Sequence, residues 1–147
     1  PKGASAEELG LDREMVALAQ NVARELSDGM ASRDRVQGIR DDVKERVEDL
    51  DRKVKAKYDE AMRLLQDEDE AGARRALEEK LGLSGKLETA RKDLEVSEAR
   101  CALLGRSVTQ LEARALEVQR LLERARVAEG PARQDLAYEA SRLSVSP

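Results

Sequence analysis

Histidine, tryptophan and phenylalanine are absent from this chain of 147 residues, which has one cysteine, two tyrosines and three prolines. Without histidine the chain can form neither a Ser-His-Asp triad nor a Cys-His dyad, and no imidazole can bind a metal ion. A single cysteine supplies neither a disulfide framework nor a thiolate cluster. We therefore expect no enzyme activity, no metal site and no cofactor.

The scarcity of aromatic residues also limits the fold and the partners. Aromatic residues make up 1% of the chain and charged residues 39%, so a conventional globular core is not expected. The formal net charge of -4 and the lack of an aromatic stacking platform argue against nucleic acid as the main partner. Apolar runs are far shorter than the roughly 20 residues that span a bilayer, and no signal-peptide hydrophobic region is present.

The chain has instead the composition of long helices. Its prolines stand at positions 1, 131 and 147, and alanine, leucine, glutamate, arginine and lysine dominate the intervening stretch. In the first half, apolar residues recur at intervals of three, four and four, which is an eleven-residue repeat. This stripe consists of Val36, Ile39, Val43, Val47, Leu50, Val54, Tyr58, Ala61 and Leu65, with Met15, Ala19, Val22, Leu26 and Met30 upstream.

In the second half, apolar residues alternate at intervals of three and four over more than five heptads, which is typical of a coiled-coil seam. They are Leu87, Ala90, Leu94, Ser97, Cys101, Leu104, Val108, Leu111, Ala115, Val118, Leu122 and Ala125. Between the two stripes, residues 66–70 contain no apolar side chain. We therefore predict that a turn at 67–69 joins two helices.

Folding the chain back between Glu68 and Asp69 places apolar residues opposite one another. Leu87 then faces Leu50, Leu94 faces Val43, and Leu111 faces Leu26. The predicted hairpin seam comprises Met15, Val22, Leu26, Val36, Val43, Val47, Leu50, Leu87, Leu94, Cys101, Leu111 and Leu122. The pairing is weakest where Val108 meets Gly29, a gap that we expect Met30 to fill.

The predicted fold is all-α: a long antiparallel two-helix coiled-coil hairpin, a rod, with a short C-terminal helical segment. Its arms occupy about 11–66 and 70–129, and each would be roughly 85 to 90 Å long. We expect residues 1–10 to be flexible. After the helix stop at Gly130-Pro131, residues 130–147 are expected to form a short helix and a tail.

Four consecutive acids, Asp67, Glu68, Asp69 and Glu70, form the predicted hairpin tip. They resemble the start of an EF-hand calcium loop, but Ala71 occupies a ligand position of that pattern. We interpret them instead as caps of the second helix, where carboxylates meet free N–H groups. Cys101 is interpreted as a small buried hydrophobe of the seam rather than a redox thiol.

Several apolar residues fall outside the predicted seam, and a two-helix hairpin cannot cover them all. They are Leu77, Leu81, Leu103, Leu116 and Leu121 on the second arm, with Leu18 and Leu64 on the first. Because uncovered apolar stripes usually mark partner surfaces, we predict that the five leucines of the second arm form an assembly surface of a homo-oligomer or filament.

The segment from Tyr58 to Lys80, YDEAMRLLQDEDEAGARRALEEK, resembles the hairpin tip of the family of phage shock protein A and vesicle-inducing protein in plastids (Vipp). In that family a short acidic turn precedes a D-L-A-R-x-A-L-x-x-K pattern, to which 70–80 correspond here. The downstream stretch 87–128 is similar to the second arm of the family.

The resemblance implies an ESCRT-III-like hairpin whose copies assemble on membranes and act in membrane maintenance, remodelling and stress response. It implies a location in the bacterial cytoplasm or plastid stroma, peripheral to the inner or thylakoid membrane. It also implies contact with anionic lipid and, in bacterial relatives, restraint of an AAA+ transcriptional activator.

Three features depart from the family. Residues 1–10 carry one large apolar residue, Leu9, so we expect the family's membrane-binding helix to lie outside this sequence. Gly72 stands where a leucine is usual, and only 132–143 follow the hairpin. The sequence is compatible with a shortened chain or with a divergent member. A protein-binding regulator and a structural subunit of a larger complex remain the alternative functions.

Overall fold

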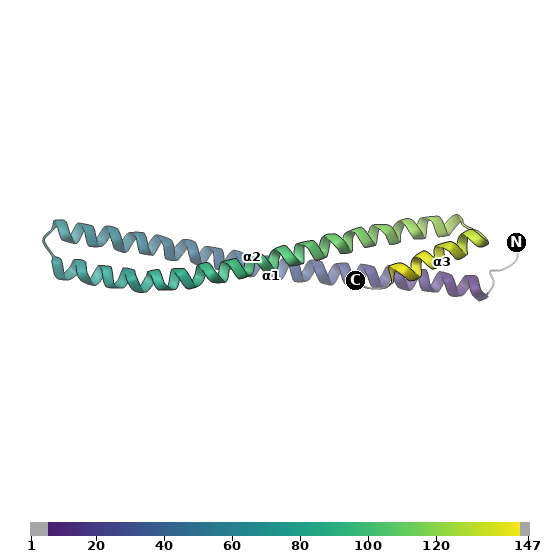
Figure 1. Ribbon diagram of the computed structural model, residues 1–147, viewed down its shortest axis with the longest axis horizontal. Coiled ribbons are helices and arrows are strands. Elements are labelled where there is room, and N and C mark those ends of the chain that lie inside the picture. The colour runs from purple at the N-terminus through teal and green to yellow at the C-terminus, as the bar shows by residue number, and fades with distance from the viewer. Residues whose placement is uncertain (1–5, 145–147) are drawn as a thin grey trace. The chain divides into compact units, whose positions relative to one another are not determined.

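The computed structural model describes residues 6–144, which form three helices and no strand. Helix α1 spans Ala6–Gln66, α2 spans Glu70–Val127 and α3 spans Pro131–Leu143 (Figure 1). The two long helices pack as a hairpin, which confirms the predicted all-α fold with a short C-terminal helix. Residues 6–10 belong to α1, while the remainder of the predicted flexible segment and the last three residues of the tail lie outside the described residues.

The hairpin turn occupies residues 67–69, as predicted. Glu68 has a positive φ of 62°, and its N–H donates to the Leu65 carbonyl at 3.1 Å. The Asp69 N–H donates to the Leu64 carbonyl at 2.9 Å, which completes a Schellman motif at the end of α1. Asp69 also caps α2 from the position before its first residue, since its Oδ1 accepts a hydrogen bond from the Gly72 N–H at 2.9 Å. The predicted capping role is therefore confirmed for Asp69.

The chain divides into two compact units. The first, the tip unit, comprises residues 34–103 and contains the turn. Leu50, Leu87 and Ala90 form its buried cluster, with Val47 and Val54 packed against it. Nearer the turn the buried side chains are small, namely Ala61, Ala73 and Ala76. The core of the tip unit is therefore one row of contacts between two helices.

The eleven-residue repeat predicted for the first arm is wrong. Ile39, Tyr58 and Leu65 are 52%, 48% and 46% exposed, so they lie off the seam. One row of covered positions of α1 in the tip unit alternates at intervals of four and three: Val36, Arg40, Val43, Val47, Leu50, Val54, Lys57, Ala61 and Leu64. This heptad period matches that of α2, which two helices need to keep their seams in contact.

The heptad of α1 does not appear as a pattern of apolar residues, because polar residues occupy two of its seam positions. Arg40 and Lys57 occupy seam positions, and their side chains are 34% and 29% exposed. Both can cover apolar neighbours with their aliphatic stems while the charged group reaches water. Leu64, predicted to lie off the seam, is half-buried on it.

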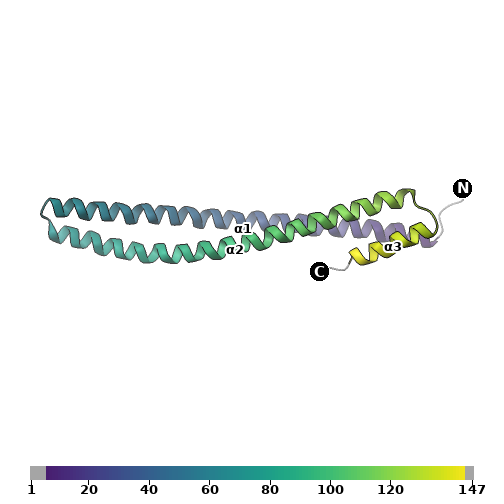
Figure 2. The ribbon, with the colours of Figure 1, turned by 45° about the horizontal axis from the view of Figure 1, so that its top comes forward.

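The second unit, the three-helix unit, combines residues 1–33 with 104–147 and includes α3. Figure 2 shows α3 lying back along the other two helices. Its Leu136 is buried in one cluster with Leu18 of α1 and Leu121 of α2. The prediction that Leu18 and Leu121 lie uncovered is therefore wrong, because a third helix covers the side that a two-helix hairpin would leave open.

Gly130 and Pro131 end the hairpin and start α3, in agreement with the predicted helix stop. Gly130 has φ 60° and ψ -132°, a conformation that glycine adopts readily, and Pro131 stands in the first turn of α3. The Gly130 carbonyl accepts from the Arg133 N–H at 3.0 Å. This geometry lets the chain reverse within the three residues that separate α2 from α3.

Two arginines hold α3 in place. The Arg133 guanidinium pairs with Asp12 of α1 and donates to the Ala125 carbonyl of α2 at 2.7 Å. At the other end, Arg114 of α2 donates to the Leu143 carbonyl at 3.0 Å and pairs with Glu25 of α1 at 2.9 Å. Because both side chains are largely covered, these contacts fix the helix at both of its ends.

Candidate assembly surface

All twelve predicted seam residues are covered to some extent. Met15, Val22, Leu50 and Leu87 are buried, whereas Leu26, Val36, Val43, Val47, Leu94, Cys101, Leu111 and Leu122 are half-buried. Cys101 carries a free thiol. The gap at Gly29 is filled by Leu111, whose Cδ1 would lie 3.0 Å from a Cβ added there. The expectation that Met30 fills it is wrong, because Met30 is 40% exposed.

The predicted assembly surface divides into three parts. Leu121 is fully buried and cannot contact another molecule. Leu103 and Leu116 are exposed on α2, in different units. Leu77 and Leu81 are 42% and 76% exposed and belong to the tip unit, close to the turn. Single exposed leucines are ordinary, so the residues around Leu77 and Leu81 decide whether a surface exists there.

Three further apolar side chains lie beside these two leucines. The sequence patterns did not indicate that these three side chains are exposed. Tyr58, Met62 and Leu65 of α1 are 48%, 43% and 46% exposed. Each of the five residues immediately follows a seam position, so each is turned about 100° from the seam in the same sense. Because the two helices are right-handed and run antiparallel, this rotation brings the three residues of α1 and the two leucines of α2 to the same face of the hairpin. We call Tyr58, Met62, Leu65, Leu77 and Leu81 the tip patch.

Contacts between the helices support this shared face. The Lys80 ammonium lies 5.5 Å from the centre of the Tyr58 ring, close enough for a cation–π contact. Farther from the turn, Arg91 pairs with Asp51 at 3.6 Å, and these two residues also follow seam positions. A signal in the sequence could have revealed the patch, namely large apolar residues one position after each heptad seam residue.

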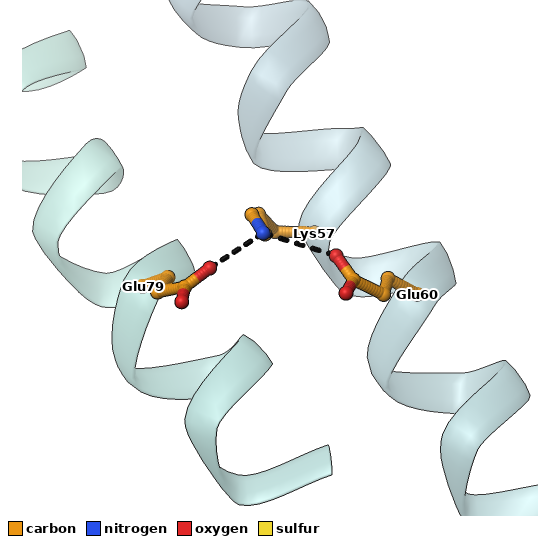
Figure 3. Close-up of polar contacts among 3 residues, drawn as sticks. All are labelled: Lys57, Glu60 and Glu79. Carbon is orange, nitrogen blue, oxygen red and sulfur yellow. Dashed lines mark hydrogen bonds and ion pairs between the residues drawn. The ribbon is translucent and has the colours of Figure 1, made fainter. Parts of the chain in front are cut away.

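Charged side chains pair on the opposite side of the tip, and Figure 3 shows three of them, Lys57, Glu60 and Glu79. The Lys57 Nζ lies 2.5 Å from the Glu79 carboxylate and 3.0 Å from that of Glu60. The hydrogen bonds to Glu79 and then Glu60 raise the pKa of Lys57, and Lys57 in turn lowers the pKa of Glu79. The tip therefore has one face of paired charges, which interact well with water, and one apolar face that no part of the described tip unit covers.

The acidic turn contributes a cap and a local field of negative charge. A Cβ added to Gly72 would lie 2.8 Å from the Asp69 Cγ, so the capping carboxylate occupies the space that a larger residue would fill. This close approach favours glycine at position 72 while the Asp69 carboxylate caps the helix. Between residues 6 and 144, no group of three or more carboxylate or thiol side chains is placed to hold a metal ion.

The fold and the tip patch define an all-helical hairpin protein with an uncovered apolar face beside an acidic turn. None of the helices within the described range has the length and apolar character needed to cross a membrane. No protein-family model matches the sequence, and no curated protein or solved structure matches it. The family resemblance therefore rests on the residues quoted for it.

Proposed function

We propose that this chain is a self-assembling scaffold of the phage shock protein A and Vipp type, which associates with a membrane and serves to maintain or remodel it. The observation that carries the proposal is the tip patch, five large apolar side chains left uncovered on one face of the tip unit. Contiguous apolar surface of this kind is typical of a site where another molecule binds.

The membrane part of the proposal comes from the sequence resemblance. The acidic turn and the net charge of -4 work against direct adhesion of the hairpin to anionic lipid. An amphipathic helix preceding the first arm would supply that contact, with the hairpin remaining free to contact other copies. The location that follows is the cytoplasmic or stromal side of the inner or thylakoid membrane.

Assembly is tested by sedimentation and electron microscopy of the chain. We expect oligomers or filaments whose formation is weakened by replacing Leu77 and Leu81 with glutamate. Gln110→Glu with Gln119→Glu is the matched control, because it adds the same two charges at exposed polar positions of α2. A chain that stays monomeric at every concentration, with and without lipid, would contradict the scaffold.

Membrane association is tested by flotation with vesicles of phosphatidylglycerol and phosphatidylethanolamine. We expect the chain as given to float weakly, and a version with an amphipathic helix added before Pro1 to float with the vesicles and deform them. If the extended chain remains folded but unbound, the membrane function is wrong.

A second candidate is a regulator that docks on one protein partner, such as an AAA+ protein, or a structural subunit. The burial of Leu18 and Leu121 beneath α3 favours it, because it removes two residues from the surface available for extended assembly. A folded monomer that neither polymerises nor binds vesicles, and that binds an AAA+ activator through Leu77 and Leu81, would support this candidate over the scaffold.

A further inference from the structure

Helix α3 occupies an apolar site formed by α1 and α2 in the three-helix unit. We call this the α3 site, and its buried residues are Met15, Leu18, Val22, Val118, Leu121 and Ala125. Leu136 of α3 is buried among them, and Ala140 and Leu143 pack against the cluster. Because a helix of 13 residues is marginal by itself, α3 depends on this site for its stability. The site fits a helix with the apolar spacing of α3, and every copy of the chain carries one.

The polar contacts of α3 also belong to the site. The Arg133 guanidinium pairs with Asp12 and donates to the Ala125 carbonyl, and the Glu139 carboxylate pairs with Arg124 at 2.7 Å. None of these residues belongs to the connection between α2 and α3, which consists of residues 128–130. An α3 that reached the site from another copy of the chain would therefore make the same contacts.

Gly130 lets the connection take two directions. Its φ of 60° and ψ of -132° are the mirror image of an extended conformation with φ about -60° and ψ about 132°, and glycine adopts the two about equally readily. The extended form is also the one that a residue before a helix usually adopts and that a residue before proline prefers. The hydrogen bonds that the Gly130 carbonyl accepts from Arg133 and Gln134 stay intact, because the peptide between Gly130 and Pro131 does not change. The chain can therefore redirect α3 without removing its cap.

No packing holds Gly130 in the conformation with positive φ. Glu129, Gly130 and Pro131 are exposed, and a Cβ added to Gly130 would meet no atom within 4 Å. The docking of α3 on its own copy therefore relies on a backbone conformation that only glycine adopts at little cost.

The direction of α3 suits a site on a second copy. In the closed chain, where α3 lies on its own copy, α3 runs back along α2, so the two helices point in opposite directions (Figure 2). In a copy related by a two-fold axis at the end of α2, the α3 site runs in the direction in which the first α2 points. A chain that passes Gly130 without reversing enters that site with the correct polarity. When extended, the connection spans about 13 Å from Val127 to Pro131.

We propose that two copies of this chain exchange α3, so that each α3 occupies the α3 site of the other copy and the three-helix units meet end to end about a two-fold axis. The exchanged dimer repeats the contacts that α3 makes in the closed chain, so the two forms differ mainly in the conformation of the connection and in the cost of association. A short connection favours exchange. The inference rests on the proposed function, since it supplies one contact by which copies assemble.

Crosslinking between copies tests the exchange. In a Cys101→Ser background, which removes the only native thiol, Arg124→Cys and Glu139→Cys replace two residues whose side chains are in contact. The two single variants, one with a mass tag, are unfolded together in urea, refolded and treated with a short bis-maleimide. We expect a crosslinked heterodimer, because the α3 of one copy then lies on the α2 of the other. Val96→Cys mixed with Glu139→Cys is the control, since Val96 is exposed on α2 outside the three-helix unit.

Gly130→Ala supplies the second test, measured by sedimentation equilibrium. Alanine disfavours the positive φ of the closed chain, so the substitution should favour the exchanged dimer by about tenfold for each of its two connections. Gly105→Ala is the matched control, because Gly105 lies within α2 and an added Cβ would likewise meet no atom within 4 Å. A Gly130→Ala chain that stays monomeric, whether its α3 is docked or released, would overturn the exchange.

The outcomes also separate the exchange from the scaffold proposal. Leu136→Glu should abolish the exchanged dimer, whereas Tyr138→Glu should not, because Tyr138 is 68% exposed on the same helix. If the mixed variants crosslink no more than the control while the unmodified chain still forms larger assemblies, the exchange is wrong and the scaffold stands. If the unmodified chain is monomeric throughout, both fail. Exchanged dimers that never assemble further would support the exchange and contradict the scaffold.

Discussion

At the scale of single residues, Asp69 and Gly72 depend on each other. The Asp69 carboxylate caps α2 through the Gly72 N–H, and it occupies the space where a Cβ at position 72 would lie. Alanine at 72 would favour the helix by about 1 kcal/mol but would displace a cap of similar value. The two effects should nearly cancel as long as Asp69 is present.

We therefore predict that Gly72→Ala changes the free energy of unfolding little in the native background. In an Asp69→Ala background, where the cap is already lost, the same substitution should stabilise the chain by about 1 kcal/mol. Urea unfolding of the four variants measures this coupling. Equal effects of Gly72→Ala in the two backgrounds would show that the carboxylate and position 72 do not interact.

The ion pair between Lys57 and Glu79 predicts a dependence of stability on pH. Because Lys57 lowers the folded-state pKa of Glu79 below 4.5, the pair stabilises the fold above that pH and loses its effect as pH falls through the lowered value. Lys57 has a raised pKa, so its contribution is present below pH 10.5 and is lost above it as the ammonium deprotonates.

Glu79→Gln should thus destabilise the chain at pH 7 and have a progressively smaller effect toward pH 3 or in high salt. Chemical denaturation across that pH range is the measurement. Glu78→Gln serves as the matched control, because Glu78 is exposed and lies outside the pair. A Glu79→Gln effect that persists unchanged under strong acid would mean that packing, not charge, accounts for it.

At the scale of helices, α3 determines which leucines belong to the core. Leu121 is fully buried against α3, whereas Leu103 on the same helix is 61% exposed. Replacing Leu121 with alanine should cost about 2 to 5 kcal/mol through lost burial and a cavity. Leu103→Ala should change stability by no more than about 0.5 kcal/mol. Thermal or urea unfolding of the two variants measures these values. Both variants replace a leucine of α2 with alanine, so they differ only in the burial of that leucine.

The contrast between Leu121 and Leu103 also shows what the sequence could predict. The heptads of α2, the turn at 67–69 and the helix after Pro131 follow from local patterns, and the structure agrees with all three. The docking of α3 could not be inferred, because it depends on the reversal at Gly130 and on contacts that Arg133 and Arg114 make with distant residues.

The apolar pattern predicts the wrong seam for α1 for a different reason. A search for apolar residues passes over Arg40 and Lys57, although both lie at seam positions, and selects Ile39 and Tyr58 beside them. The same error concealed the tip patch, since residues assigned to the interior were not considered for the surface. Only the partner helix, with its uninterrupted heptads, fixes which side of α1 is covered.

At the scale of the whole molecule, the two units bury different kinds of side chain. The three-helix unit buries one alanine, Ala125, and seven larger side chains, Met15, Leu18, Val22, Val108, Val118, Leu121 and Leu136. The tip unit buries Leu50 and Leu87 with four alanines, Ala61, Ala73, Ala76 and Ala90. Because opening a region costs more when it exposes more apolar area, the part of the tip unit near the turn should open more readily.

Hydrogen exchange measures this difference. We predict that amides in 58–80 exchange faster than those in 15–22 and 118–125 when the chain is dilute. If copies assemble through the tip patch, protection of 58–80 should rise with protein concentration, because the assembly must dissociate before the helices open. Leu81→Glu should abolish that rise and leave 118–125 unchanged. Exchange at 58–80 that is independent of concentration, in a sample that sedimentation shows to be dimeric, would place the contact between copies elsewhere on the chain.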